Sequence, residues 1–190
     1  TRFRTKKLFE SISSVVKTCS DPIKIEFLIA LDNDDTETLA FINSLTINAR
    51  IRFLVTERYG YNNLNTYYNL AAKYAEGKWF WLWTDDMVMT SQNWDKIIIS
   101  YEDQFIVINP HTTNAQWNEY TKDVCIVPIV SRKWYEALGR VSAWNHIDTY
   151  IYRVAKSLYM IVQDNSLTNI HKSKDENEAV SYHVVPFPFE

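Results

Sequence analysis

Two adjacent carboxylates, Asp85 and Asp86, follow the aromatic run WFWLW at 79–83, and the chain turns apolar again directly after them. An aromatic and aliphatic run of this kind is typical of a buried strand. Neighbouring carboxylates repel each other, and a nearby cation relieves that repulsion. Oxygen ligands at a strand end suit Mg²⁺ or Mn²⁺, which usually complete their coordination with substrate phosphates and water. The pair is therefore a candidate metal site.

A second acidic cluster follows another expected strand. The run IKIEFLIAL at 23–31 is followed by Asp32, Asp34 and Asp35. Acidic residues are also good helix N-caps, so either cluster alone is well explained by capping. In open parallel sheets, however, ligands bind at the carboxyl ends of the strands. Two acidic clusters at the same edge of one sheet therefore favour a binding site over two caps.

The elements that must position these carboxylates alternate between helices and strands in the first half of the chain. The hydrophobic pattern predicts helices at 6–17, 36–45 and 63–76 and strands at 23–31, 51–56 and 79–83. Strands separated by helices of this length need crossover connections, which predict a mainly parallel sheet flanked by helices. In the second half we expect helices at 92–100, 132–138 and 146–158, strands at 105–109, 124–130 and 159–163, and a tail without regular structure at 164–190.

Length and composition restrict the classes of protein. The 190 residues, of which 46% are hydrophobic, fit one globular domain with a substantial core. A formal net charge of −3 argues against a nucleic-acid partner, which normally binds a basic surface. With 3 glycines in the chain, a glycine-rich phosphate loop is excluded, so a nucleotide must be held by other groups.

The cysteines and the hydropathy bear on the compartment. Cys19 and Cys125 are far apart and lack metal-binding spacing, so we expect free thiols in a reducing compartment rather than a disulfide or a metal site. No apolar run reaches about 18 residues, so no transmembrane segment is predicted. The expected location is the cytoplasm, either in solution or peripheral to a membrane.

Four segments occur in an order that resembles the nucleotide-sugar glycosyltransferases of the GT-A fold, and the family 2 type in particular. They are TRFR at 1–4, LDNDDTET at 31–38, NTYYNLAAKYAEG at 65–77 and WLWTDDMVM at 81–89. The resemblance implies a single Rossmann-like α/β domain, with a nucleotide-binding half at 1–90 and an acceptor half with the C-terminal tail at 91–190. The family normally has a strand before the TRFR-like segment, so the resemblance also implies that the chain lacks this first strand or is truncated before it.

The resemblance assigns roles to both acidic clusters. In the family, the turn that matches LDNDDTET receives the nucleoside, and the N-terminal segment lies near the nucleotide or its diphosphate. The implied nucleotide-binding residues are Thr1, Arg2, Arg4, Asp32, Asp34, Asp35 and Asp85. Asp86 is the implied direct metal ligand, together with Asp85. His171 is a further implied ligand, because some members of the fold use a late histidine. Thr84 stands where the family usually has another acid.

The acceptor half resembles the family in its strand, helix and following acidic segment, VCIVPIVSRKWYEALGRVSAWNHIDTYIYRV at 124–154. In the family an acid near the start of a helix removes the proton from the acceptor hydroxyl. Asp148 is the first candidate for this base. In a second alignment His146 takes the role, and Asp148 is then a helix N-terminal acid favoured by the helix dipole.

The implied activity is metal-dependent transfer of a hexose-like sugar from a nucleoside diphosphate-sugar to a hydroxyl of a glycan or other acceptor. A UDP-sugar is the favoured donor, Mn²⁺ or Mg²⁺ the cofactor, and a single displacement would invert the anomeric centre. One alternative is a nucleotidyltransferase, ranked lower because such enzymes usually use a glycine-rich or strongly basic loop. The other is a non-catalytic carbohydrate- or protein-binding domain, which the threonine at position 84 keeps open.

Overall fold

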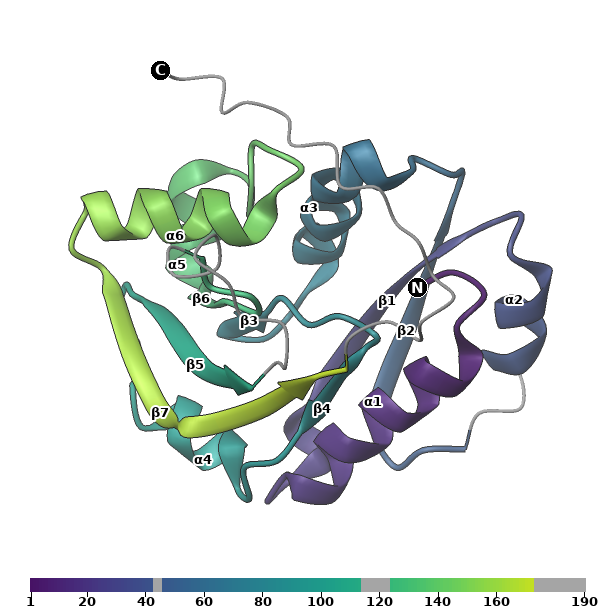
Figure 1. Ribbon diagram of the computed structural model, residues 1–190, viewed down its shortest axis with the longest axis horizontal. Coiled ribbons are helices and arrows are strands. Elements are labelled where there is room, and N and C mark those ends of the chain that lie inside the picture. The colour runs from purple at the N-terminus through teal and green to yellow at the C-terminus, as the bar shows by residue number, and fades with distance from the viewer. Residues whose placement is uncertain (43–45, 114–123, 173–190) are drawn as a thin grey trace.

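The structure is a computed structural model that describes residues 1–42, 46–113 and 124–172 (Figure 1). The helices are α1 Thr5–Thr18, α2 Thr36–Ile42, α3 Leu64–Tyr74, α4 Trp94–Ile99, α5 Arg132–Leu138 and α6 Ile147–Ser157. The strands are β1 Glu26–Asp32, β2 Arg50–Thr56, β3 Trp79–Trp81, β4 Met87–Met89, β5 Val107–Thr113, β6 Ile129–Ser131 and β7 Ile161–His171. Two short 3-10 helices, η1 Pro22–Lys24 and η2 Tyr61–Asn63, precede β1 and α3.

The strands form two groups with different pairing. β1 and β2 pair in parallel, and the other strands form a mixed sheet in the order β3-β6-β5-β7-β4. In that sheet β5 and β7 are parallel, whereas β3–β6, β5–β6 and β4–β7 are antiparallel. Parallel neighbours need a crossover connection, which α2 supplies for β1 and β2, while α5 and α6 lie on the path from β5 to β7.

The α/β class was predicted correctly, but the described sheets contain more antiparallel pairing than the mainly parallel sheet that was expected. The physical reason is that β4 and β6 follow the preceding strands without a helix among the described residues of the connection. Their partners are then chosen by contacts distant in sequence, which hydrophobic periodicity does not encode.

The mixed sheet buries both faces under helices. Successive side chains of a strand point to opposite faces. Val107 of β5 therefore packs with residues of α3, α5 and α6, whereas Ile108 packs with residues of α1 and α4. Val130 and Ile129 of β6 divide in the same way. Figure 1 shows α5 and α6 on one side of the sheet and α4 on the other. This two-sided burial makes the sheet a rigid platform for the residues at its edge.

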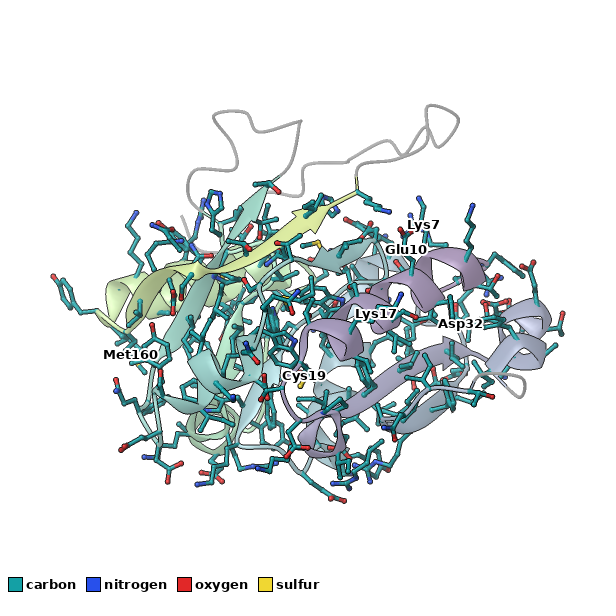
Figure 2. The ribbon with its side chains drawn as sticks, turned by 90° about the horizontal axis from the view of Figure 1, so that it is seen from below. Lys7, Glu10, Lys17, Cys19, Asp32 and Met160 are labelled. Atoms are coloured by element: carbon teal, nitrogen blue, oxygen red, sulfur yellow. The ribbon has the colours of Figure 1, made fainter. Side chains whose placement is uncertain are left out.

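Helix α1 buries one face and exposes the other. Leu8, Ile12 and Val15 are buried, as their spacing predicts for an amphipathic helix. Glu10 and Lys17 lie on the exposed face (Figure 2). Both cysteines, one just after α1 and one deep in the core, are free thiols. No helix in the described part of the chain combines the length and the apolar character needed to cross a bilayer.

The largest departures from the predicted elements lie around the acidic pair. β3 ends at Trp81 instead of residue 83, because the chain leaves the strand in a turn where Trp83 N donates to Trp81 O at 2.9 Å. β4 was not predicted.

Two predicted strands of the second half differ in length from the observed ones. The predicted strand at 124–130 is reduced to β6 at its end. The predicted last strand, in contrast, continues as β7 through residues 164–171, which were expected to lack structure.

The extension of β7 has a physical cause that its polar sequence conceals. Leu167 and Asn169 are fully buried, while their neighbours are more exposed, so the segment alternates as a strand does. It pairs with both β4 and β5. Residues 43–45, at the end of a predicted helix, and 173–190 of the predicted tail lie outside the described ranges.

Candidate active site

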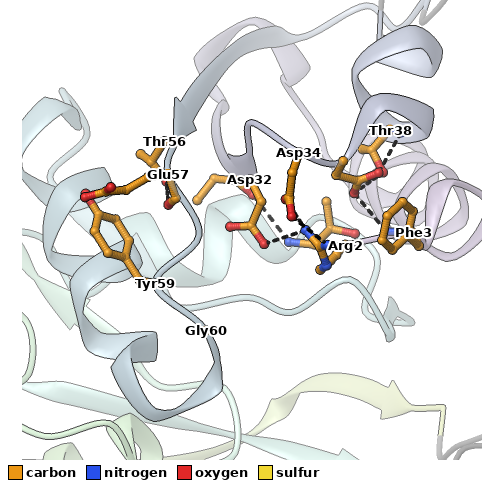
Figure 3. A network of polar contacts seen from close by, with 12 residues as sticks. Arg2, Phe3, Asp32, Asp34, Thr38, Thr56, Glu57, Tyr59 and Gly60 are labelled. Atoms are coloured by element: carbon orange, nitrogen blue, oxygen red, sulfur yellow. Dashed lines mark hydrogen bonds and ion pairs between the residues drawn. The ribbon is translucent and has the colours of Figure 1, made fainter.

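Arg2 ties the N-terminal segment to the end of β1 (Figure 3). Its Nη1 lies 3.1 Å from Asp32 Oδ2, and its Nη2 lies 3.0 Å from Asp34 Oδ2. Asp32 is buried, Asp34 is half exposed, and the hydrogen bond and charge of Arg2 lower the pKa of Asp34. Just before Arg2, the amino group of Thr1 lies 3.4 Å from Ala30 O of β1. Four of the residues predicted to bind the nucleotide thus lie at one strand end.

Asp32 is held from a second side by Tyr67 of α3. The Tyr67 hydroxyl donates to Asp32 Oδ1 at 2.5 Å and accepts hydrogen bonds from the backbone N–H groups of Tyr59 and Gly60. Burial and the hydrogen bond to Asp32 raise the pKa of Tyr67, so its hydroxyl keeps its proton and donates. Sequence reasoning missed this residue. Tyr67 lies on α3, which follows β2 and not the acidic end of β1, so no local pattern indicated the contact.

Both carboxylate oxygens of Asp35 accept hydrogen bonds from neighbouring residues of the chain. Its Oδ1 accepts from Thr38 N at 3.0 Å, and its Oδ2 accepts from Thr38 Oγ1 at 2.6 Å and from Phe3 N at 2.8 Å. Burial would raise the pKa of Asp35, but these hydrogen bonds lower it. The residue therefore has the geometry of an N-cap for α2. It also fixes Phe3, a half-exposed residue with φ of 50° whose ring lies 4.6 Å from the Arg2 guanidinium carbon.

Arg4 reaches the second acidic cluster, at the turn between β3 and β4. Its Nη1 lies 2.9 Å from Asp85 Oδ1 and 3.6 Å from Asp86 Oδ2. Thr84 Oγ1 donates to Asp86 Oδ1 at 2.6 Å, so the threonine that replaces the usual acid orients the second carboxylate. The remaining oxygen of Asp85, Oδ2, is buried and has no hydrogen-bond partner among the described residues.

His171 joins this cluster from the end of β7. Because β7 runs antiparallel to β4, His171 lies opposite Met87, and its Nε2 is 3.4 Å from Asp86 Oδ2. Burial would raise the pKa of Asp86, but the hydrogen bonds from His171 and Thr84 and the charges of His171 and Arg4 bring it to about 2. The carboxylate is therefore ionised at neutral pH. The strand pairing thus brings His171 to Asp86, two of the three residues that were predicted to hold a metal.

The donor set fits a divalent cation that also binds a substrate. Carboxylate oxygens with one imidazole suit Mn²⁺, and carboxylates alone suit Mg²⁺. Within 1–42, 46–113 and 124–172, no three acidic, histidine or cysteine side chains are gathered as a preformed metal site. The buried, unpartnered Asp85 Oδ2 is an atom whose desolvation a cation would offset.

Both predicted base residues lie at the start of α6. His146 is the N-cap residue, and its ring centroid lies 4.4 Å from that of Trp144. Asp148 follows in the first turn, where its Oδ1 accepts from Thr149 N at 2.7 Å. Burial raises the pKa of Asp148. A raised pKa strengthens a carboxylate as a base, because its protonated form is favoured.

Tyr68 of α3 contacts the chain just before the acidic pair. Its hydroxyl donates to Trp83 O at 3.2 Å. Burial raises its pKa, and so do the negative charges of Asp85, Asp86 and Asp148. The Tyr68 hydroxyl therefore keeps its proton at neutral pH. Sequence reasoning did not single out Tyr68 either.

Asn69, the next residue of α3, fixes the loop that leads into α6. Its Oδ1 accepts from Val141 N at 2.8 Å and from Ser142 N at 3.1 Å, and its Nδ2 donates to Ser142 O at 2.8 Å. Val141 and Ser142 are fully buried. A single helix, α3, thus holds Asp32 through Tyr67, contacts the segment before the acidic pair through Tyr68 and positions the loop before α6 through Asn69.

Comparison with solved structures reveals several similar folds. The mannosyltransferase PcManGT from Pyrobaculum calidifontis, in complex with GDP-Man and Mn²⁺, matches with a TM-score of 0.72 and 11% identity over 93% of this chain and 56% of that chain. TarS 1-349 of S. aureus, in complex with UDP-GlcNAc, matches with a TM-score of 0.69 and 13% identity over 95% of this chain and 60% of that one. HddC from Yersinia pseudotuberculosis matches with a TM-score of 0.55 and 12% identity, covering 86% and 78%.

These likenesses establish the GT-A fold, although this chain spans only 56% and 60% of the first two structures. No curated protein matches the sequence. Residues 2–156, in contrast, match the sequence profile of the family described as Glycosyl transferase family 2. The match includes both acidic clusters and the start of α6. The chain therefore belongs to glycosyl transferase family 2.

Proposed function

We propose that this chain is a metal-dependent glycosyltransferase that moves a hexose from a nucleoside diphosphate-sugar to an acceptor hydroxyl. The observation that carries the proposal is the cluster of Asp85, Asp86 and His171, in which a buried Asp85 oxygen has no hydrogen-bond partner among the described residues. Family membership supports the reaction class. The GDP-Man complex of PcManGT and the UDP-GlcNAc complex of TarS support a nucleotide-sugar donor carrying a hexose.

In this proposal Arg2 and the two carboxylates that it contacts, Asp32 and Asp34, receive the nucleoside. Tyr67 and Arg2 fix the two oxygens of Asp32, so this carboxylate is a rigid acceptor for a base or ribose group. Arg2 and Arg4 supply charge-assisted hydrogen bonds to the diphosphate. Thr1 and Asp34 line the same strand end, while Asp35 acts indirectly by holding Phe3. UDP-sugars are the favoured donors, and GDP-sugars are the alternative donors to be tested beside them.

Asp85, Asp86 and His171 would hold Mn²⁺ or Mg²⁺. Such an ion, when bound, offsets the charge that grows on the leaving diphosphate. Thr84 directs the second carboxylate by binding Asp86 Oδ1, which leaves Oδ2 toward Arg4 and His171.

Asp148 is the proposed base for the acceptor hydroxyl. Burial raises its pKa, which favours proton uptake, and it lies in the first turn of α6. Direct attack by the deprotonated hydroxyl would invert the anomeric centre. His146 is the alternative base, and its contact with Trp144 would then fix the ring. A glycan is the favoured acceptor, and the cytoplasm, where free thiols stay reduced, is the proposed compartment.

Donor binding tests the proposal most simply. The thermal stability of the chain is followed with UDP- and GDP-sugars, with Mn²⁺ and with EDTA. We expect a sugar nucleotide to raise the melting temperature in Mn²⁺ and to lose this effect in EDTA and in Asp86→Asn. Asp103→Asn is the matched control, because Asp103 is exposed and pairs with Lys78, beside the opposite end of β3. A stabilisation that is equal in Asp86→Asn and in the control would refute the metal site.

One observation favours a second candidate, a non-catalytic binding domain. Arg4 already supplies a positive charge to the acidic pair, as it could in a protein that uses no metal. The two candidates differ in transfer: an enzyme moves the sugar from the bound donor to an acceptor, whereas a binding domain binds the same donor and transfers none.

A further inference from the structure

Arg4 lies on the two carboxylates that the proposed function assigns to a metal. Its side chain is 28% exposed, and those of Asp85 and Asp86 are 10% and 18% exposed. Nη1 is the atom that contacts both, at 2.9 Å from Asp85 Oδ1 and 3.6 Å from Asp86 Oδ2. A single guanidinium therefore bridges the pair inside a largely desolvated site.

This contact has an electrostatic reason. Two adjacent, mostly buried carboxylates cannot both remain ionised without a compensating charge. Arg4 provides that charge from the N-terminal segment, and His171 Nε2 lies 3.4 Å from Asp86 Oδ2. The compensation is incomplete, since Asp85 Oδ2 is buried without a hydrogen-bond partner in the described ranges.

The same contact opposes a divalent cation. A metal bound by Asp86 Oδ2 would lie next to the guanidinium that faces this oxygen, and the two positive charges repel in a site of low effective dielectric. The metal must therefore either displace the Arg4 guanidinium or bind in spite of the repulsion from its positive charge. A diphosphate removes this conflict, because its oxygens can accept both the guanidinium and the metal.

The chain is built so that Arg4 can move without unfolding a helix. Arg4 precedes α1 as its N-cap residue, with φ of −131° and ψ of 40°, and it forms no side-chain cap to the helix. Arg2, two residues earlier, contacts the other acidic cluster. The two arginines thus place one guanidinium on each acidic cluster from a short segment outside the helix.

We infer that Arg4 is an internal counter-ion of the Asp85–Asp86 pair, which weakens metal binding in the free protein and couples it to the binding of a nucleoside diphosphate. Arg4 is a positioning residue in this inference, which rests on the proposed metal site. When the diphosphate binds, the guanidinium moves from the carboxylates to the phosphate oxygens, and the pair becomes available to the metal.

The test measures Mn²⁺ affinity from the free-ion signal in electron paramagnetic resonance, with and without UDP. We expect UDP to tighten Mn²⁺ binding to the wild type by about tenfold, within the 5–150-fold span that is usual for coupled sites. Arg4→Gln should bind Mn²⁺ alone by about the same factor more tightly than the wild type, and UDP should tighten its Mn²⁺ binding by a smaller factor than in the wild type. Asp86→Asn should abolish the gain in the double variant.

Two controls separate charge from fold. Arg4→Lys keeps the positive charge and should retain weak binding of Mn²⁺ alone. Lys78→Gln removes one positive charge beside the far end of β3 and should leave Mn²⁺ affinity at the wild-type value. Thermal melts of each variant without metal show whether it is folded, and Arg4→Met, which also removes the positive charge, carries the test if Arg4→Gln does not fold.

The outcomes distinguish the two proposals. If Arg4→Gln binds Mn²⁺ as the wild type does, or more weakly, while Asp86→Asn reduces binding, the counter-ion inference is overturned and the metal site stands. If Asp86→Asn has no effect on Mn²⁺ binding in any background, the metal site itself is refuted, and the inference with it.

Discussion

The hydrogen bonds of Asn69 lead to a prediction that links stability to sugar transfer. In Asn69→Ala, the buried N–H groups of Val141 and Ser142 and the carbonyl of Ser142 all lose their partner on α3. A lost hydrogen bond that leaves a buried group unpaired costs about 1–3 kcal/mol. Partial solvation of the loop reduces the sum, so we expect a loss of about 3 kcal/mol in the free energy of unfolding. In a domain of this size that corresponds to a fall of about 6–12 °C in melting temperature.

Urea unfolding of Asn69→Ala and Asn63→Ala tests this prediction. Asn63 is the matched control, because its exposed side chain donates one hydrogen bond to Tyr59 O, and its loss should cost well under half as much. Asn69→Ala should also lower sugar transfer more than donor binding, since the released loop leads to His146 and Asp148. Equal free-energy losses in the two variants would show that Asn69 does not hold the loop.

Three further variants test the electrostatics and the capping. Asp148 has a raised pKa, so the folded protein loses stability as pH rises through that pKa and the buried carboxylate ionises. Asp148→Asn should therefore have a higher melting temperature than the wild type at pH 7. The difference should shrink toward pH 4. Asp86, with a pKa of about 2, contributes roughly 2 kcal/mol to the free energy of unfolding above pH 4, and this contribution is lost as pH falls toward 2. In acid unfolding without metal, the free energies of unfolding of the wild type and Asp86→Asn should therefore become equal. Asp35→Ala should cost about 1–2 kcal/mol by loss of the α2 cap, against less than about 0.5 kcal/mol for Glu37→Ala in the same turn, in urea unfolding.

The strand-end rule explains how much of the site could be predicted. Asp32 and Asp85 each follow an apolar run, and ligands of open α/β sheets bind beyond the carboxyl ends of the strands. The expectation that both clusters share the edge of one sheet was wrong, because β1 and β3 belong to different sheets among the described strands. The sequence still predicted both clusters, and the resemblance supplied His171, which lies 3.4 Å from Asp86. Their roles in binding and catalysis stay predictions.

The remaining parts of the site could not be predicted, because they depend on pairing between distant segments. Tyr67 meets Asp32 across 35 positions, and Asn69 meets Val141 across 72. Antiparallel pairing of β4 with β7 is equally remote, and the polar sequence of residues 164–171 hides their alternation. Hydrophobic periodicity identifies a strand, but it does not name the strand's partner.

The central claim is that Asp85 and Asp86 bind a metal together with a nucleotide-sugar diphosphate. The most direct measurement is the anomalous scattering of Mn²⁺ in a crystal soaked with UDP and Mn²⁺. We expect a manganese peak at the Asp85 and Asp86 carboxylates, with His171 beside it and Arg4 turned toward the diphosphate. A manganese peak on the diphosphate that lies away from both carboxylates would contradict it.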